Sequence, residues 1–182
     1  MAIQTPSLSV LICSLPNRLK NLASITGKIK GCEVIYLGDN KYMTVGEKRN
    51  WLLRIAHGKY VTFVDDDDFI SDDYVKEIVE ATKSDADVIV FDVACSVNGG
   101  KFKPVIYDIA YKRDKNLTDR YLRRPNHLMA VKREIALKTG FPEKSSPSTH
   151  TAPASMAWRS VSEIEGKMPF MNFITKVETR TA

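Results

Sequence analysis

The sequence predicts an α/β fold in which a mostly parallel central sheet is flanked by helices. Short apolar runs, typical of strands buried on both faces, alternate with segments of helical periodicity. Polar clusters follow three of these runs, at residues 14–18, 38–40 and 65–68. The length of 182 residues suits one domain with a substantial core. Ligands bind beyond the carboxyl ends of parallel strands, so the three clusters are expected to meet there.

Residues 8–13 form the first predicted strand. Pro16 interrupts it, and a modest helix then reaches about residue 27. A second strand is expected over residues 33–37, ending at the polar turn 38–40.

A helix is predicted to begin at Thr44, because Thr44 and Glu47 have the spacing of a capping box. The periodicity assigns its buried face to Trp51, Leu52, Ile55 and Ala56. Gly58 is suited to end this helix. The third strand, residues 60–64, then runs directly into the aspartates.

Ser71 is expected to cap the next helix, with acidic residues 72–73 near its positive end. The predicted buried stripe of this helix consists of Val75, Ile78, Val79 and Thr82. The remaining elements are a strand at 87–93, a hairpin turn at 98–100 leading to a strand at 102–109, a strand at 127–131 and a helix at 132–139 ended by Gly140.

Composition excludes several classes of protein. The net charge of +5 is mild and does not by itself indicate a nucleic-acid partner. Cys13, Cys32 and Cys95 are widely spaced and form no CxxC pair, which argues against a disulfide framework or a zinc site and fits a reducing cytoplasm. No signal peptide is recognisable, and no apolar run is long enough to cross a bilayer.

The four consecutive aspartates, Asp65 to Asp68, are the main chemical feature of the sequence. Adjacent carboxylates repel one another, so a bound cation or hydrogen-bond donors must offset their charge, and Mg²⁺ and Mn²⁺ prefer such oxygen ligands. If the segment is extended, Asp65 and Asp67 point the same way and are able to face one ligand. The alternative is a solvated acidic turn, but the position after a buried strand favours a site. The spacing of a calcium-binding loop is absent.

The segment 46–50 opens the predicted second helix, where free backbone N–H groups attract anions. Lys48 and Arg49 add positive charge where a diphosphate would sit; the alternative is an ordinary charged surface helix. Glycine-rich dinucleotide-binding and P-loop motifs are missing.

These pieces, in this order, resemble family 2 glycosyltransferases of the GT-A fold. The resemblance rests on Leu8 to Arg18, on Gly46 to Asn50, and on Ala56 to Asp68. It spans roughly residues 7–93, with a weaker echo at 126–143. It implies a nucleotide-sugar donor, a UDP-sugar in particular, and a DXD-type motif for Mn²⁺ or Mg²⁺.

The resemblance also implies roles for individual residues. Leu15, Pro16 and Asp39 would line the pocket for the base, uracil in a UDP-sugar. Lys48, Arg49 and Asn50 would lie near the donor, as would Asp66. Asp65 would approach the ribose, and Asp67, with Asp65, would hold the metal that bridges the diphosphate. The implied mechanism is displacement with inversion, in which a carboxylate base takes the proton of the acceptor hydroxyl.

That base is expected in a Glu-Asp pair beyond residues 140–144, and the chain lacks it. Residues 145–155 are rich in Ser, Pro and Thr, and no acidic residue follows until Glu163. The sequence therefore divides into a GT-A-like domain at 1–144 and an atypical segment at 145–182 that is expected to be poorly ordered. Either the acceptor side has diverged or been truncated, or the reading frame shifts after about Lys144. The catalytic base is thus unknown, and His150 and Glu163 are placeholders.

Residues 112–138 hold nine basic residues against three acidic ones, either as a solvated face or as a surface for a polyanionic acceptor. His127 could contact the acceptor or diphosphate, although a lone histidine beside an apolar strand is more often structural. The sequence thus predicts a metal-dependent glycosyltransferase whose acceptor is a glycan, a lipid-linked sugar or a modified DNA base. The alternatives are a non-catalytic nucleotide-sugar-binding relative and a DNA-binding module.

Overall fold

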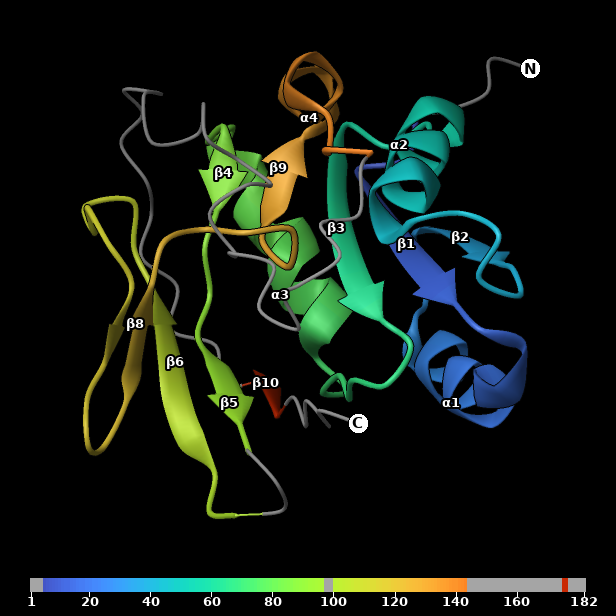
Figure 1. Cartoon of the computed structure of the whole chain (residues 1–182). Helices are drawn as coiled ribbons and strands as arrows, with labels where there is room; N and C mark the ends of the chain where they lie inside the picture. The colour runs from blue at the N-terminus through green and yellow to red at the C-terminus, as the bar shows by residue number, and fades with distance from the viewer. Residues whose placement is uncertain (1–4, 97–99, 144–174, 177–182) are drawn as a thin grey trace.

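The computed structural model describes residues 5–96 and 100–143 and the backbone of residues 175–176. Its central sheet has the strand order β2-β1-β3-β9-β4 (Figure 1). These strands are β1 (Leu8–Ser14), β2 (Glu33–Gly38), β3 (Tyr60–Asp65), β4 (Val88–Ile89) and β9 (Ala130–Lys132). β1 pairs in parallel with β2 and β3, whereas β9 is antiparallel to β3 and β4. The predicted mostly parallel sheet is confirmed.

Helices cover both faces of this sheet. They are the 3-10 turn η1 (Pro16–Arg18), α1 (Leu19–Lys28), α2 (Val45–Ile55), α3 (Tyr74–Ala81), the 3-10 turn η2 (Thr82–Ser84) and α4 (Arg133–Thr139). Neighbouring residues of β3 point to opposite faces of the sheet and contact different helices. Phe63 packs against Phe141, which follows α4, and lies beneath Arg49 of α2. Its neighbour Thr62 points the other way, to the Tyr74 hydroxyl of α3 at 3.0 Å.

A second sheet, which the sequence did not predict, stands beside the first (Figure 1). Its strand order is β10-β5-β6-β8-β7. The strands are β5 (Val93–Cys95), β6 (Lys103–Tyr107), β7 (Lys115–Asn116), β8 (Tyr121–Arg123) and β10 (Thr175–Lys176). The predicted pairing of the strands around residues 98–100 is confirmed, since β5 and β6 are antiparallel; residues 98 and 99 themselves lie outside the described residues.

The predicted single strand at 87–93 is wrong. β4 ends at Ile89 in the central sheet, and the chain enters the second sheet at Val93. Val88 to Phe91 and Val93 are all buried, and Asp92 is the one residue between them that is polar. Hydrophobicity alone gives no signal of where a buried chain passes from one sheet to another.

The capping box of α2 is confirmed, with both Thr44 and Glu47 hydrogen bonds present. Its predicted buried face is confirmed at Leu52 and Ala56 but wrong at Trp51 and Ile55, which are 51% and 40% exposed. The inward face instead includes Lys48 and Leu53. The predicted end of the helix is also wrong. The helix ends at Ile55 rather than at Gly58.

The predicted cap of α3 is also wrong. The helix begins at Tyr74, and the cap residue Asp73 makes no side-chain capping bond. Ser71 instead closes a preceding turn, in which its carbonyl accepts a hydrogen bond from the Tyr74 N–H at 3.2 Å. The buried positions of α3 are Tyr74, Val75, Ile78 and Ala81. Val79 and Thr82, predicted in that stripe, are only partly buried.

None of the helices within residues 5–96 and 100–143 is long and apolar enough to span a bilayer. The three cysteines are free thiols. The atypical segment predicted at 145–182 lies outside the described residues except for the backbone of β10.

Candidate functional site

The aspartates lie at the carboxyl end of β3, where the sequence predicts a site. β3 ends at Asp65, and a turn closes when the Asp68 N–H donates to the Asp65 carbonyl at 3.0 Å. The segment is therefore not extended, and the expectation that Asp65 and Asp67 point the same way because of strand geometry is wrong. The turn gives each of the four carboxylates a different environment.

Asp65 lies between two side chains from distant parts of the chain. Its Oδ1 is 3.1 Å from Arg49 Nη2, and its Oδ2 is 3.3 Å from His127 Nε2. Burial raises the pKa of Asp65, but the His127 ring and the Arg49 guanidinium outweigh burial and hold it below the ordinary value. Burial and the nearby Arg49 charge lower the pKa of His127, and the Asp65 carboxylate opposes this. The carboxylate is thus ionised and held from two sides.

Arg18 binds the next two carboxylates together. Its Nη1 lies 2.7 Å from Asp66 Oδ1 and 3.0 Å from Asp67 Oδ2. The Leu15 N–H donates to Asp66 Oδ2 at 2.8 Å. Burial raises the pKa of Asp67, and the Arg18 charge opposes this only in part. Sequence reasoning missed Arg18, although its place in the polar cluster 14–18 was the available signal.

Asp68 is the most buried of the uncompensated carboxyl groups, with 4% of its surface exposed. Its Oδ1 has no hydrogen-bond partner within the described part of the chain. Burial, reinforced by the charges of Asp65 and Asp67, raises the pKa of Asp68 to about 9. Asp68 therefore carries a proton at neutral pH. It borders a small cavity of about 60 Å³ that Ile25 and Ile70 also line.

The third polar cluster, residues 38–40, lies at the same edge of the sheet, where Asp39 forms an ion pair with Lys48. Asp39 Oδ1 lies 2.5 Å from Lys48 Nζ, and Lys48 also donates to the Ser14 carbonyl at 3.4 Å. The Lys48 hydrogen bond, together with the Met43 N–H, lowers the pKa of Asp39. Strand register explains the convergence, since Ser14 pairs with Gly38 and Cys13 with Asp65. The predicted meeting of the three clusters is confirmed.

Leu15 is partly buried and Pro16 exposed at the end of β1, beside the aspartate turn to which the Leu15 N–H is bonded. Asn50, predicted near the donor, has other contacts in this structure. Its Nδ2 donates to the Phe141 carbonyl at 2.9 Å and to Glu143 Oε1 at 3.1 Å, while its Oδ1 accepts from the Phe141 N–H at 2.8 Å. Asn50 thus links α2 to the segment after α4 by hydrogen bonds.

The described residues contain no group of three or more His, Cys, Asp or Glu side chains that could hold a metal ion by themselves. His150 and Glu163, the placeholders for a base, lie outside the residues that the structure describes.

Comparison with known proteins identifies the family. A model of glycosyl transferase family 2 matches residues 14–140. A search of curated proteins finds no match. The crystal structure of S. aureus TarS 1-349 matches with a TM-score of 0.60 and 15% identity, covering 96% of this chain and 60% of that one. Its complex with UDP-GlcNAc matches with a TM-score of 0.58 and 14% identity, covering 97% and 59%.

A further S. aureus TarS structure gives a TM-score of 0.61 at 14% identity, over 96% of this chain and 37% of that chain. The chain therefore spans about 60% of the length of TarS 1-349. Identity at this level shows the shared GT-A fold. The family match covers well over half of the chain, and the chain belongs to glycosyl transferase family 2.

Proposed function

We propose that the protein transfers a sugar from a UDP-sugar to an acceptor hydroxyl, with inversion and with the help of Mn²⁺ or Mg²⁺. The observation that carries the proposal is the convergence of Asp39, Asp65 and Asp67 with Arg18 and Arg49 at one sheet edge of a family 2 domain. Structural neighbours with the same fold bind UDP and UDP-GlcNAc. The convergence of these side chains and the ligands of the structural neighbours both support a nucleotide donor.

The donor would lie across the carboxyl ends of β1, β2 and β3. Leu15, Pro16 and Asp39 border the side proposed for the uracil, and Lys48 holds the Asp39 carboxylate in place. Asp65, ionised by its own surroundings, is suited to accept hydrogen bonds from ribose hydroxyl groups. Because Arg49 and His127 already fix its two oxygens, Asp65 would meet the donor without reorganising.

The carboxylates fit a hard cation on chemical grounds. Asp67 keeps 24% of its side chain exposed, and the one ion-pair partner it has among the described residues, Arg18, is shared with Asp66. Mg²⁺ is commonly held by about one or two carboxylates, with phosphates and water completing its shell. Asp67, with Asp65, would hold the ion in that way. Bound there, it would offset charge on the departing diphosphate as a Lewis acid.

The residues of this chain contribute to the same charge balance. The Arg18 and Arg49 guanidinium groups stand at the aspartate turn, where they reduce repulsion between the carboxylates and an incoming diphosphate. His127 Nε2 lies 3.3 Å from Asp65 Oδ2, and this contact holds the carboxylate in position.

The second candidate is a non-catalytic nucleotide-sugar-binding protein. The observation that favours it is the absence of the expected Glu-Asp pair after residue 144. Both candidates require the same donor site, and they differ only in turnover.

Calorimetric titration with UDP, UDP-sugars and other nucleotide-sugars, with and without Mn²⁺, tests the donor site. We expect Asp67→Ala to lose the Mn²⁺-dependent gain in UDP affinity, by about tenfold or more, because truncating a charge-paired ligand typically costs about 2 kcal/mol or more. Asp72→Ala is the matched control, since Asp72 is a surface residue whose ion-pair partner in the described part of the chain is Lys28 alone. If neither UDP nor any UDP-sugar binds, both candidate functions fail. Binding without hydrolysis or transfer supports the non-catalytic candidate.

A further inference from the structure

The positive charge of the protein is concentrated in one short segment. Residues 101–124 contain eight Lys and Arg residues and three Asp residues. The rest of the chain contains nineteen basic and nineteen acidic residues, so it is balanced. The net charge of +5 is therefore a property of this segment and not of the protein as a whole.

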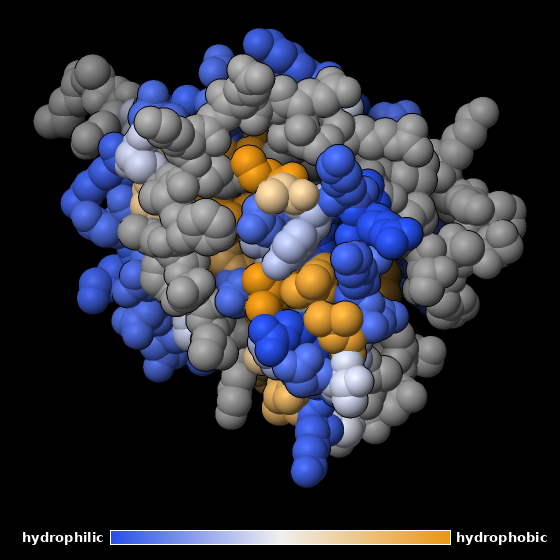
Figure 2. All heavy atoms as spheres, turned by 90° about the vertical axis from the view of Figure 1, so that its left-hand side faces the viewer, coloured by the Kyte–Doolittle hydropathy of each residue, from blue (hydrophilic) through white to orange (hydrophobic). Residues whose placement is uncertain are grey.

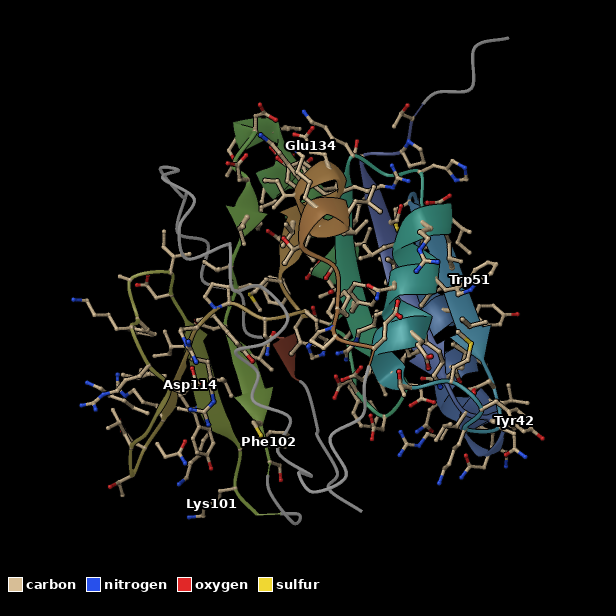
Figure 3. The ribbon with its side chains drawn as sticks, turned by 45° about the horizontal axis from the view of Figure 1, so that its top comes forward. Tyr42, Trp51, Lys101, Phe102, Asp114 and Glu134 are labelled. Atoms are coloured by element: carbon tan, nitrogen blue, oxygen red, sulfur yellow. The ribbon has the colours of Figure 1, made fainter. Side chains whose placement is uncertain are left out.

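The fold places this segment in the second sheet, on β6, β7 and β8 and the loops beside them. We call this surface the basic sheet. Its exposed basic side chains are Lys101, Lys112, Arg113, Lys115 and Arg120. Figure 3 shows nitrogen-tipped side chains fanning out around Asp114, away from the central sheet. Figure 2 faces this side of the molecule and shows hydrophilic atoms around a central hydrophobic strip.

The acidic residues of the segment are already occupied. Asp119 pairs with Arg120 at 2.5 Å, and Asp114 pairs with Arg124 at 3.4 Å. Asp108 accepts a hydrogen bond from the Ala110 N–H at 2.8 Å. These contacts leave most of the cationic groups unpaired.

Six of the eight cations have no carboxylate at ion-pair distance within residues 5–96 and 100–143. They are Lys101, Lys103, Lys112, Arg113, Lys115 and Arg123. Lysine on an edge strand discourages pairing with another sheet, and this accounts for Lys115 on β7. It does not account for Lys101, Lys112 and Arg113, which lie outside the strands.

The basic sheet is joined to the aspartate site by a short path. Arg123 and Lys103 lie over the Tyr121 ring, at 5.1 and 5.6 Å from its centroid. Tyr107 of β6 pairs with Arg123 of β8. The Tyr107 hydroxyl accepts a hydrogen bond from Asn126 Nδ2 at 3.3 Å. His127, which contacts Asp65, follows directly along the chain.

Tyr107 thus pairs with Arg123 of the basic sheet and is bonded to Asn126, the residue before His127. The basic sheet and the aspartate turn are therefore linked through adjoining residues.

We propose that the basic sheet binds the acceptor and that this acceptor is a linear polymer with a phosphodiester backbone. The inference rests on the proposed transferase function and names its substrate class. Unpaired cations distributed over three strands and their loops suit a chain of regularly spaced charges better than one compact anion. Arg and Lys contacts to backbone phosphates release counterions and give affinity without reading any base.

The test measures binding of fluorescent oligomers in the absence of nucleotide. The probes are an abasic deoxyribose-phosphate oligomer, oligo(dT) of the same length and polyglutamate of equal charge. We expect the two phosphodiester probes to bind alike and at least tenfold more tightly than polyglutamate. Lys112→Glu/Arg113→Glu/Lys115→Glu should weaken abasic binding at least tenfold and reduce the slope of log K against log salt by about 2, from about 0.7 per lost contact.

The matched control is Lys20→Glu/Lys30→Glu/Lys76→Glu, which makes the same change of charge at exposed positions on and beside α1 and α3. This control variant should change the affinity for the abasic oligomer less than threefold. Equal loss in both triple variants, equal binding of polyglutamate, or a tenfold preference for oligo(dT) would each overturn the proposal. UDP titration of the same variants separates this outcome from failure of the donor site, because neither triple variant alters a donor-site residue.

Discussion

The guanidinium of Arg49 lies 3.1 Å from the Asp65 carboxylate and over two phenyl rings that contact each other, 5.7 Å from the Phe63 centroid and 5.4 Å from the Phe141 centroid. Phe63 belongs to β3, and Phe141 follows α4. Arg49 therefore connects the end of β3 to the segment after α4. Its delocalised cation contacts both rings while it pairs with Asp65.

Arg49→Lys is expected to lower the free energy of unfolding by about 1–2 kcal/mol, since it keeps the charge but loses the planar contact with the rings. Urea denaturation measures the change. Arg54→Lys is the control, because the Arg54 side chain is 60% exposed and reaches Glu143 only at 3.7 Å. Equal stability of the two variants would show that the ring contacts do not matter.

Gly46→Ala is expected to be destabilising by about 1–3 kcal/mol, the usual range for forced overpacking. A Cβ at Gly46 would lie 1.9 Å from the Pro142 carbonyl oxygen, so the segment after α4 would have to move. Gly27→Ala is the matched control within a helix, because nothing lies within 4 Å of a Cβ there. It should be neutral or stabilising by up to about 1 kcal/mol. Similar losses in the two variants would contradict the close approach at Gly46.

Asn50→Ala is expected to lower the free energy of unfolding by about 1–3 kcal/mol, because the buried polar groups of Phe141 lose their partner. UDP affinity should fall far less than in Asp67→Ala, since the Asn50 amide is bonded to residues 141–143. Asn21→Ala, at an exposed position of α1, should cost no stability. Loss of UDP affinity without loss of stability would instead place Asn50 at the donor.

Asp68 is expected to make stability fall as pH rises. Its pKa is about 9 in the folded protein, above the ordinary value of 3.8, so between these pH values the native state holds a proton that the unfolded chain has released. The free energy of unfolding then decreases by at most about 1.4 kcal/mol per pH unit. Asp68→Asn removes this loss and should be more stable than the wild type at pH 8 in EDTA, with a smaller difference near pH 4. Asp72→Asn is the exposed control, and parallel curves for the wild type and Asp68→Asn would refute the assignment.

Local sequence determined much of the architecture. The apolar runs at β1, β2 and β3 and the capping box at Thr44 predict the strands, the start of α2 and the meeting of three polar clusters, because each signal depends on neighbouring residues. The same pattern located the aspartates at a strand end. It did not reveal the second sheet, since Asp92 is the one polar residue between β4 and β5, and β7 and β8 are two and three residues long.

The tertiary structure alone decided how the site is assembled. Arg18 and Leu15 are 48 and 51 residues from Asp66, and His127 is 62 residues from Asp65, so no local pattern could pair them. Lys48 is buried in an ion pair with Asp39, whereas Trp51, which hydrophobicity assigns to the buried face of α2, is exposed. Which carboxyl is ionised and which holds a proton likewise follows from charges and burial that only packing creates.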